Sequence, residues 1–264
     1  MKKPSAEELF VNRELSWLAF NHRVLQEAQV DRTPLIERVR FLGIFSNNLD
    51  EFYRVRVANL QRVLLVDKHA KTTLGFSVAQ TLEAIEVKIA ELQASYDATF
   101  RKLLLELGDE NIRFVRAEDL NEEDERFVSS YFERKVRPAL VPIMLGRKVK
   151  MPELVDGDGY LAVRLKFEDQ KNQLAIIQLP RHIPRFLTLP DRDGEHRLMF
   201  LEDVIRLVLP NIFRLFQADS IDAFALKGTR DAAMDMDDMD MAESTEMPDM
   251  TDATPTMEMS ESDS

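Results

Sequence analysis

A cluster of polar residues at 46–51 offers the side chains best suited to ligand contact. It reads Ser-Asn-Asn-Leu-Asp-Glu, within a stretch where apolar residues otherwise recur every three or four positions. The amides of Asn47 and Asn48 both donate and accept hydrogen bonds, but asparagine is a poor former of helix interiors. Two in succession therefore predict a tertiary role, either bonding to neighbouring helices, which is the commoner use, or ligand contact. Asp50 is expected to pair with Arg54, one turn further on.

Few other patterns point to catalysis or to a cofactor. The sequence contains neither a GxxxxGK[ST] phosphate loop nor a GxGxxG fingerprint, and it has no cysteine for disulfides or thiolate chemistry. Residues 155–159 are interpreted as a turn, because the later ligands of a calcium loop are not at the required spacing. The histidines show no pair at metal-ligand spacing and are expected to be packed or surface residues: His22, His69, His182 and His196. No metal site is predicted.

The elements that must position the polar cluster are long amphipathic helices. Apolar residues at three- and four-residue steps predict helices over 13–29, 34–65 and 77–107. Pro34 suits the first position of the second helix, and Gly108 supplies a stop for the third. Long helices with short joins favour antiparallel packing, so residues 1–107 are predicted to form a helical bundle.

The pattern changes after Gly108, and residues 108–230 are predicted to form a smaller domain of helices and strands. A helix is expected over 121–135 and another over 202–209. Alternating residues at 159–167 and an apolar run at 174–179 predict an antiparallel hairpin, and shorter strands are expected at 198–201 and 223–226. The predicted fold class is therefore α+β.

Residues 231–264 differ in composition from the rest of the chain. They hold eight Asp, four Glu and eight Met, with no Lys, Arg, Leu, Ile, Val or aromatic residue. The charge of these residues equals the net charge of −12 for the whole chain, so residues 1–230 carry equal numbers of basic and acidic side chains. With so little to pack into a core, this acidic, Met-rich tail is expected to be disordered.

Two segments of the predicted bundle resemble a known family. ELSWLAFN at 14–21 and LGIFSNNLDEFYRVRV at 42–57 resemble the amino-terminal domain of bacterial polyphosphate kinase, in an unusual order of polar and aromatic residues. Weaker similarity runs through PRFLTLP at 184–190 to TRDAAMDMDD at 229–238. The resemblance therefore covers residues 1 to about 238, and it implies only the first two domains of that family.

The family transfers the terminal phosphate of ATP to polyphosphate through a phosphohistidine, with Mg²⁺ and several arginines steadying the charge. Its nucleophilic histidine and Mg²⁺ ligands belong to later domains, so the resemblance implies a truncated homologue with no catalytic residue of its own. It also implies that Asn48 contacts the nucleotide of ATP, an amide being suited to an adenine edge or a ribose. Asn47 is a weaker candidate for the same contact.

The resemblance also implies partners. The second domain of the family helps to form the dimer, so a homodimer or a heteromer with full-length polyphosphate kinase is expected. A basic set in this region could attract a polyanion such as polyphosphate, but solvated strand edges and ordinary ion pairs explain it equally well: Arg164, Lys166, Arg181, Arg185 and Arg197. Nothing indicates nucleic-acid binding. Without a signal peptide or an apolar run of membrane-spanning length, a cytoplasmic chain with no integral membrane segment is expected.

Three hypotheses follow for residues 1–238. In the first, the chain supplies one side of the nucleotide site and the dimerisation domain of a polyphosphate kinase. In the second, it is a non-catalytic interaction or regulatory protein that binds a complete polyphosphate kinase. In the third, Asn47 and Asn48 are packing devices without any ligand.

Overall fold

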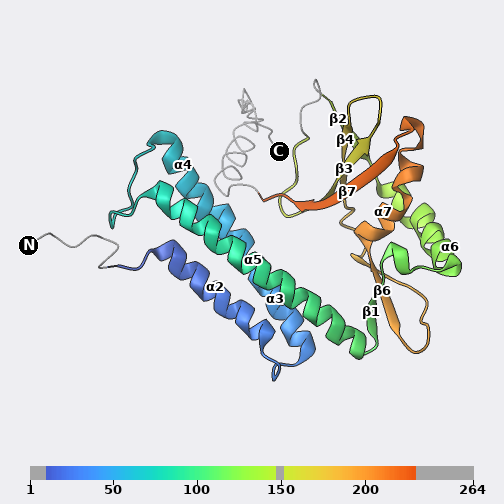
Figure 1. Ribbon diagram of the computed structural model, residues 1–264, viewed down its shortest axis with the longest axis horizontal. Coiled ribbons are helices and arrows are strands. Elements are labelled where there is room, and N and C mark those ends of the chain that lie inside the picture. Colours follow the sequence, from blue (N-terminus) through green and yellow to red (C-terminus); the bar gives the residue numbers. More distant parts are fainter. Residues whose placement is uncertain (1–9, 147–151, 230–264) are drawn as a thin grey trace, which may run out of the picture.

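A computed structural model describes residues 10–146 and 152–229. An elongated group of helices lies on one side, and a region of short strands and helices lies on the other (Figure 1). Such an α+β arrangement confirms the predicted fold class. The expected disordered tail at 231–264 lies outside the described residues, and the domain boundary near residue 107 stays a prediction.

The three expected helices of the bundle are present. The first is α2 (Arg13–Gln29), and the third is α5 (Val78–Asp109). The second is a continuous rod built from α3 (Leu35–Glu51), a π-helical segment (Phe52–Val57) and α4 (Ala58–Val66). The π-helical segment was not predicted, and it begins directly after the polar cluster.

The bundle runs up, down and up. Arg56 contacts Glu14 near the start of α2 whereas Arg38 contacts Ala28 near its end, so the second helix is antiparallel to α2. Its core is made of aliphatic and aromatic side chains that are no more than a few per cent exposed: Leu18, Leu25, Leu42, Phe45, Phe52, Ile85, Leu92 and Leu103. Burial of this stripe along all three helices is the main source of their stability, since propensity alone is weak.

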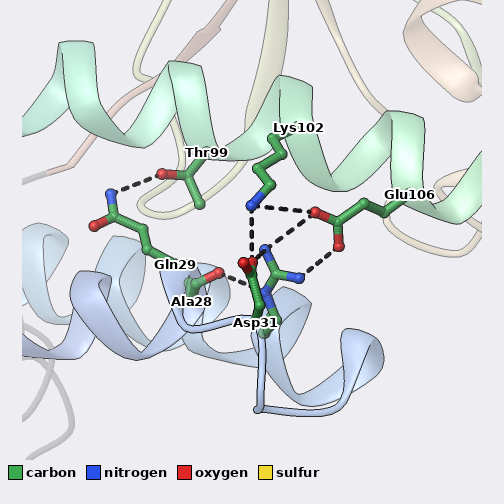
Figure 2. Close-up of polar contacts among 7 residues, drawn as sticks. Ala28, Gln29, Asp31, Thr99, Lys102 and Glu106 are labelled. Carbon is green, nitrogen blue, oxygen red and sulfur yellow. Dashed lines mark hydrogen bonds and ion pairs between the residues drawn. The ribbon is translucent and has the colours of Figure 1, made fainter.

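A network of charges closes the bundle at the α2–α3 loop. Figure 2 shows Lys102 between Asp31 and Glu106, to which its ammonium lies at 2.8 and 3.5 Å. Hydrogen bonding and charge from Lys102 lower the pKa of the exposed Asp31 carboxyl. Beneath them lies Arg38, only 3% exposed, which donates to the Ala28 carbonyl at 2.9 Å and to Glu106 at 2.5 Å. Arg38 thus joins three helices at one point.

Replacing Arg38 with Met is expected to lower the free energy of unfolding by about 1–3 kcal/mol, because the Ala28 carbonyl loses its side-chain donor and Glu106 loses its best partner. Urea unfolding followed by circular dichroism measures this change. Lys102→Met is the matched control: its side chain is 52% exposed, so its loss should cost about 1 kcal/mol or less. Equal effects of the two substitutions would contradict a special role for Arg38.

The second region contains two sheets. An antiparallel sheet has the order β2-β4-β3-β7, and a smaller sheet has the order β1-β6-β5. The predicted hairpin is confirmed: β3 (Gly159–Lys166) pairs with β4 (Gln173–Gln178), with Val163 opposite Ala175. The two other expected strands are also present, as β6 (His196–Phe200) and β7 (Ser220–Lys227).

Three strands were not predicted, namely β1 (Ile112–Phe114), β2 (Pro142–Leu145) and β5 (Phe186–Thr188). At three or four residues each, they are too short to show an alternating pattern. Two of them are held by rings instead, because Phe114 and Phe186 both pack against Phe200 on β6, with ring centroids 5.1 and 5.2 Å from it.

Helices cover one face of the larger sheet. The predicted helix over 121–135 is α6 (Glu122–Tyr131), which continues as a π-helical segment (Phe132–Val136). The predicted helix over 202–209 is α7 (Leu201–Ile212). The core between them and the strands includes Val128, Phe132, Leu161, Ile177, Met199 and Ile205. Short 3₁₀ turns lie at Ala117–Asp119, Arg137–Ala139 and Arg214–Phe216.

A buried ion pair fixes α6 to the smaller sheet. The guanidinium of Arg197 on β6 donates to both carboxylate oxygens of Asp124, at 2.9 and 2.6 Å. Asp124 is 1% exposed and also completes a capping box with Asn121 at the start of α6. The hydrogen bond from Arg197 lowers the pKa of the Asp124 carboxyl.

Two ion pairs join the helical rod to the second region. Lys227, the last residue of β7, pairs with Asp50 on α3, and Asp156 lies 3.3 Å from Arg54 in the π-helical segment. The end of β7 therefore lies against the helix that carries the polar cluster. No helix within the described ranges is both long and apolar enough to span a bilayer.

Candidate functional site

Asn48 lies in the last turn of α3, with its side chain half-buried between α3 and α2. Its Nδ2 donates to Oδ1 of Asn21 at 3.0 Å, and Nδ2 of Asn21 donates to the carbonyl of Phe45 at 3.1 Å. Asn21 is fully buried. We call these two amides and the Phe45 carbonyl the Asn48 site. The packing role that the sequence left open is therefore real for Asn48.

The Asn48 site still has capacity for a ligand. Asn48 uses one N–H of its amide for Asn21, and within the described part of the chain no donor reaches its Oδ1. An amide held from one side in this way presents its oxygen, and its second N–H, in a fixed orientation. The bond to Asn21 pre-orients the group that a polar ligand would meet.

Asn47 is placed differently. It is exposed, and within the described residues its side chain makes no hydrogen bond. Its spacing from Asp50 and Arg54 puts it on the helix face that carries the two ion pairs to the second region. The structure thus does not bring Asn47 and Asn48 to one point. The assignment of either residue to a nucleotide stays a prediction.

Residues 14–21 and 42–57, the two segments that carry the family resemblance, pack directly on each other. The Trp17 ring stacks on Phe52 with centroids 4.7 Å apart. The Arg56 guanidinium lies 5.9 Å from the Trp17 ring and donates to Glu14 at 2.9 Å. The unusual order of residues in both segments is thereby explained as a set of matched contacts across α2 and the second helix.

The π-helical segment begins four residues after Asn48. The backbone N–H of Phe52 is shared between the carbonyls of Asn48 and Leu49. A π turn contains an additional residue, so it rotates the side chains that follow relative to a regular α-helix. The rotation affects Phe52, which stacks on Trp17, and Arg54, which pairs with Asp156 of the second region. Such segments are frequent at functional sites.

Asp50 and Arg54 do not form the pair that their spacing predicts. Asp50 pairs with Lys227, and Arg54 lies 3.3 Å from Asp156. The i,i+4 rule describes isolated helices, and here the second region offers each side chain an opposite charge. These contacts place the Asn48 helix at the junction of the two regions.

The basic set of the second region consists of ion pairs rather than a free cationic surface. Every member has a carboxylate within 2.9 Å, in the pairs Arg164–Asp222, Lys166–Asp222, Arg181–Asp158, Arg185–Glu202 and Arg197–Asp124. Hydrogen bonds from Lys166 and Arg164 lower the pKa of the Asp222 carboxyl. Of the two readings of these residues, the geometry favours ordinary ion pairs.

The histidines are dispersed. His22 is half-buried on α2, His69 and His182 are exposed, and His196 lies 3.3 Å from Asp191. In the part of the chain that the structure describes, no three His, Asp or Glu side chains are grouped to hold a metal ion.

Two family models match the chain. Residues 10–115 match the polyphosphate kinase N-terminal domain, and residues 123–248 match the polyphosphate kinase middle domain. Together they extend over the bundle and the region that contains both sheets, in the order that the sequence predicts.

Individual relatives show the same extent. The chain is 38% identical over 237 residues to polyphosphate kinase from Vibrio parahaemolyticus, and 40% identical over 230 residues to that from an Exiguobacterium species; these alignments cover 88% and 86% of the chain. The crystal structure of polyphosphate kinase from Porphyromonas gingivalis matches 84% of the chain with a TM-score of 0.74 and 34% identity. The chain spans about a third of the length of these proteins.

Proposed function

Since the chain belongs to the polyphosphate kinase family through its amino-terminal and middle domains, we propose that it supplies one side of the ATP site of such an enzyme, with Asn48 as the contact to the nucleotide. In this function the phosphate of ATP passes to polyphosphate through a phosphohistidine on further domains of the family. The Mg²⁺ and its ligands belong to those domains too.

The proposal rests on the hydrogen bonding of the Asn48 amide. Asn21 holds it from the interior, while its Oδ1 has no donor among the described residues. One such hydrogen bond contributes about 0.5–1.5 kcal/mol to binding, which is far below the binding free energy that even a millimolar Kd requires. Asn48 thus acts as one contact in a composite site, and the phosphates and the reacting groups are bound elsewhere.

The test is a chimaera in which residues 1–230 replace the matching first third of a complete polyphosphate kinase. The chimaera is expected to form polyphosphate from ATP, whereas the purified 264-residue chain alone is expected to form none. Both proteins are purified from a host without its own polyphosphate kinase, and polyphosphate formation is measured with radiolabelled ATP. A folded but inactive chimaera, or ATP-dependent chain growth by the chain alone, would contradict the proposal.

A second function rests on a different observation. One row across the larger sheet, on the face opposite to α7, contains Ile143, Ile176, Ala162 and Phe224. Phe224 is 56% exposed and Ile143 is 37% exposed, whereas Ile176 between them is only 2% exposed. Exposed apolar side chains at the two ends of the row suit a protein partner. It supports a homodimer, or an interaction protein that binds a complete polyphosphate kinase.

Light scattering on the chain alone and on its mixture with a complete kinase tests this second function. A mass above that of the single chain, lost in Phe224→Ser but kept in the control Leu215→Ser, would support it. Leu215 is a suitable control because it is 87% exposed and lies in the 3₁₀ turn Arg214–Phe216, outside this row. A monomer that does not co-migrate with the kinase would count against both assemblies.

A further inference from the structure

A cavity of about 640 Å³ is lined by residues from the start of α2, the α4 helix and the loop that leads into α5. These segments lie at the opposite end of the bundle from the α2–α3 loop (Figure 1). We call this cavity the α2 cavity. Its polar lining includes Arg13, Glu14, Arg56, Asn59 and Lys71. Its apolar lining includes Leu60, Val63, Leu74 and Phe76. The cavity therefore combines a polar and an apolar part.

The charges of the α2 cavity are unequal. Among the residues that the structure describes, Glu14 is the only carboxylate in this lining. It is shared by two guanidiniums: Arg13 donates to Oε1 at 2.8 and 3.0 Å, and Arg56 donates to Oε2 at 2.9 Å. Lys71 adds a third cation to the lining, and within the described residues no carboxylate pairs with it. The lining thus has an excess of two positive charges.

Arg56 is positioned before any ligand arrives. Its guanidinium lies over the Trp17 ring, and only one of its N–H groups is used by Glu14. Glu14 itself is 7% exposed and therefore held in place. A guanidinium fixed in this way loses little entropy when its remaining N–H groups bind an anion, and its planar fork suits a phosphate.

Lys71 also stands on an ordered wall. The loop before α5 forms a small hairpin in which Lys71 is bridged to Ser77. Thr72 and Phe76 bond to each other twice, through backbone N–H to carbonyl at 2.8 Å and through the Thr72 hydroxyl at 3.2 Å. Gly75 makes the reversal at φ 90°, which favours glycine. The hairpin places the cation of Lys71 and the ring of Phe76 on the same cavity.

We propose that the α2 cavity binds a small molecule that carries a phosphate group on an apolar or ring-shaped body. Arg56 and Lys71 contact the phosphate, and the body packs on Val63, Leu74 and Phe76. This site is separate from the Asn48 site, because Arg56 follows Asn48 by eight residues, about two turns along the same helical rod.

Titration of the whole chain with phenyl phosphate and with inorganic phosphate, followed by ³¹P nuclear magnetic resonance, tests this proposal. Phenyl phosphate is expected to bind saturably and more tightly than inorganic phosphate. Lys71→Met should weaken phenyl phosphate binding about tenfold, as for the loss of one charge-assisted hydrogen bond. Arg56→Met should weaken it at least as much.

The matched control is Lys68→Met, which removes the same charge three residues away from a side chain outside the cavity lining. It should bind like the unmodified chain. Because Lys71 is exposed, its substitution tests the cavity even where Arg56→Met disturbs packing on Trp17. No saturable binding of phenyl phosphate, equal affinity for inorganic phosphate, or equal loss in Lys68→Met and Lys71→Met would each overturn the proposal.

Discussion

Replacing Asp124 with Asn is expected to lower the free energy of unfolding at pH 7 by about 3–5 kcal/mol, because it leaves a buried guanidinium without its counter-charge. The side chains of Arg197 and Asp124 are 5% and 2% exposed, so water cannot compensate. Arg192, at 3.4 Å, loses its partner as well. Urea unfolding measures the difference. The control is Glu133→Gln, which breaks an exposed pair with Arg137 and should cost about 1 kcal/mol or less.

The pair between Asp124 and Arg197 also makes the stability of the chain depend on pH. The hydrogen bond from Arg197 lowers the pKa of the Asp124 carboxyl below its ordinary value of 3.8. The stability contributed by Asp124 is therefore fully present above the unfolded-state pKa and is lost as the pH falls through the lower, folded-state pKa. The unmodified chain should lose more stability than Asp124→Asn between about pH 5 and pH 2. If the stability of the two proteins fell in parallel over this pH range, Asp124 would not be the group responsible.

Replacing Phe52 with Ala is expected to cost about 3–5 kcal/mol, as for other large-to-small substitutions of buried aromatic residues. Phe52 is 1% exposed, stacks on Trp17 and is the first residue of the π-helical segment. Its loss leaves a cavity between α2 and the helical rod. The neighbouring Tyr53, at 40% exposure, provides the control.

Denaturant unfolding of the two variants compares these positions. Tyr53→Ala should cost about 1 kcal/mol, in the range of ordinary surface-lying substitutions. If Phe52→Ala were no more harmful than Tyr53→Ala, the stacking of residues 14–21 on residues 42–57 would not be the contact that holds α2 in register. The position of the Asn48 amide would then need another explanation.

Much of the fold could be predicted from the sequence, because its long elements have strong periodicity. The three bundle helices and the β3–β4 hairpin are present where their patterns place them. The π-helical segment at 52–57 could not be predicted, since a π turn keeps the composition of an α-helix. The three short strands leave too few residues for an alternation to appear.

The candidate site shows a similar division. Asn48 was identified from its family resemblance and its place within a helix, but its partner Asn21 was missed. A signal for Asn21 existed: it occupies a buried position between Leu18 and Leu25 on α2, where a polar residue needs a bond. Asp50 and Lys227 are 177 positions apart in the sequence, so no rule based on neighbouring residues could predict their pairing.

The contribution of Asn48 to ATP binding is tested by the KM for ATP of the chimaera with Asn48→Ala, compared with that of the chimaera with Asn21→Ala. Both substitutions remove the same 3.0 Å hydrogen bond, so both destabilise the bundle. Only Asn48→Ala also removes the contact proposed for the nucleotide, so its KM should rise about threefold to tenfold further than that of Asn21→Ala. Equal KM values for the two variants would show that Asn48 only packs the helices, and would contradict its assignment to ATP.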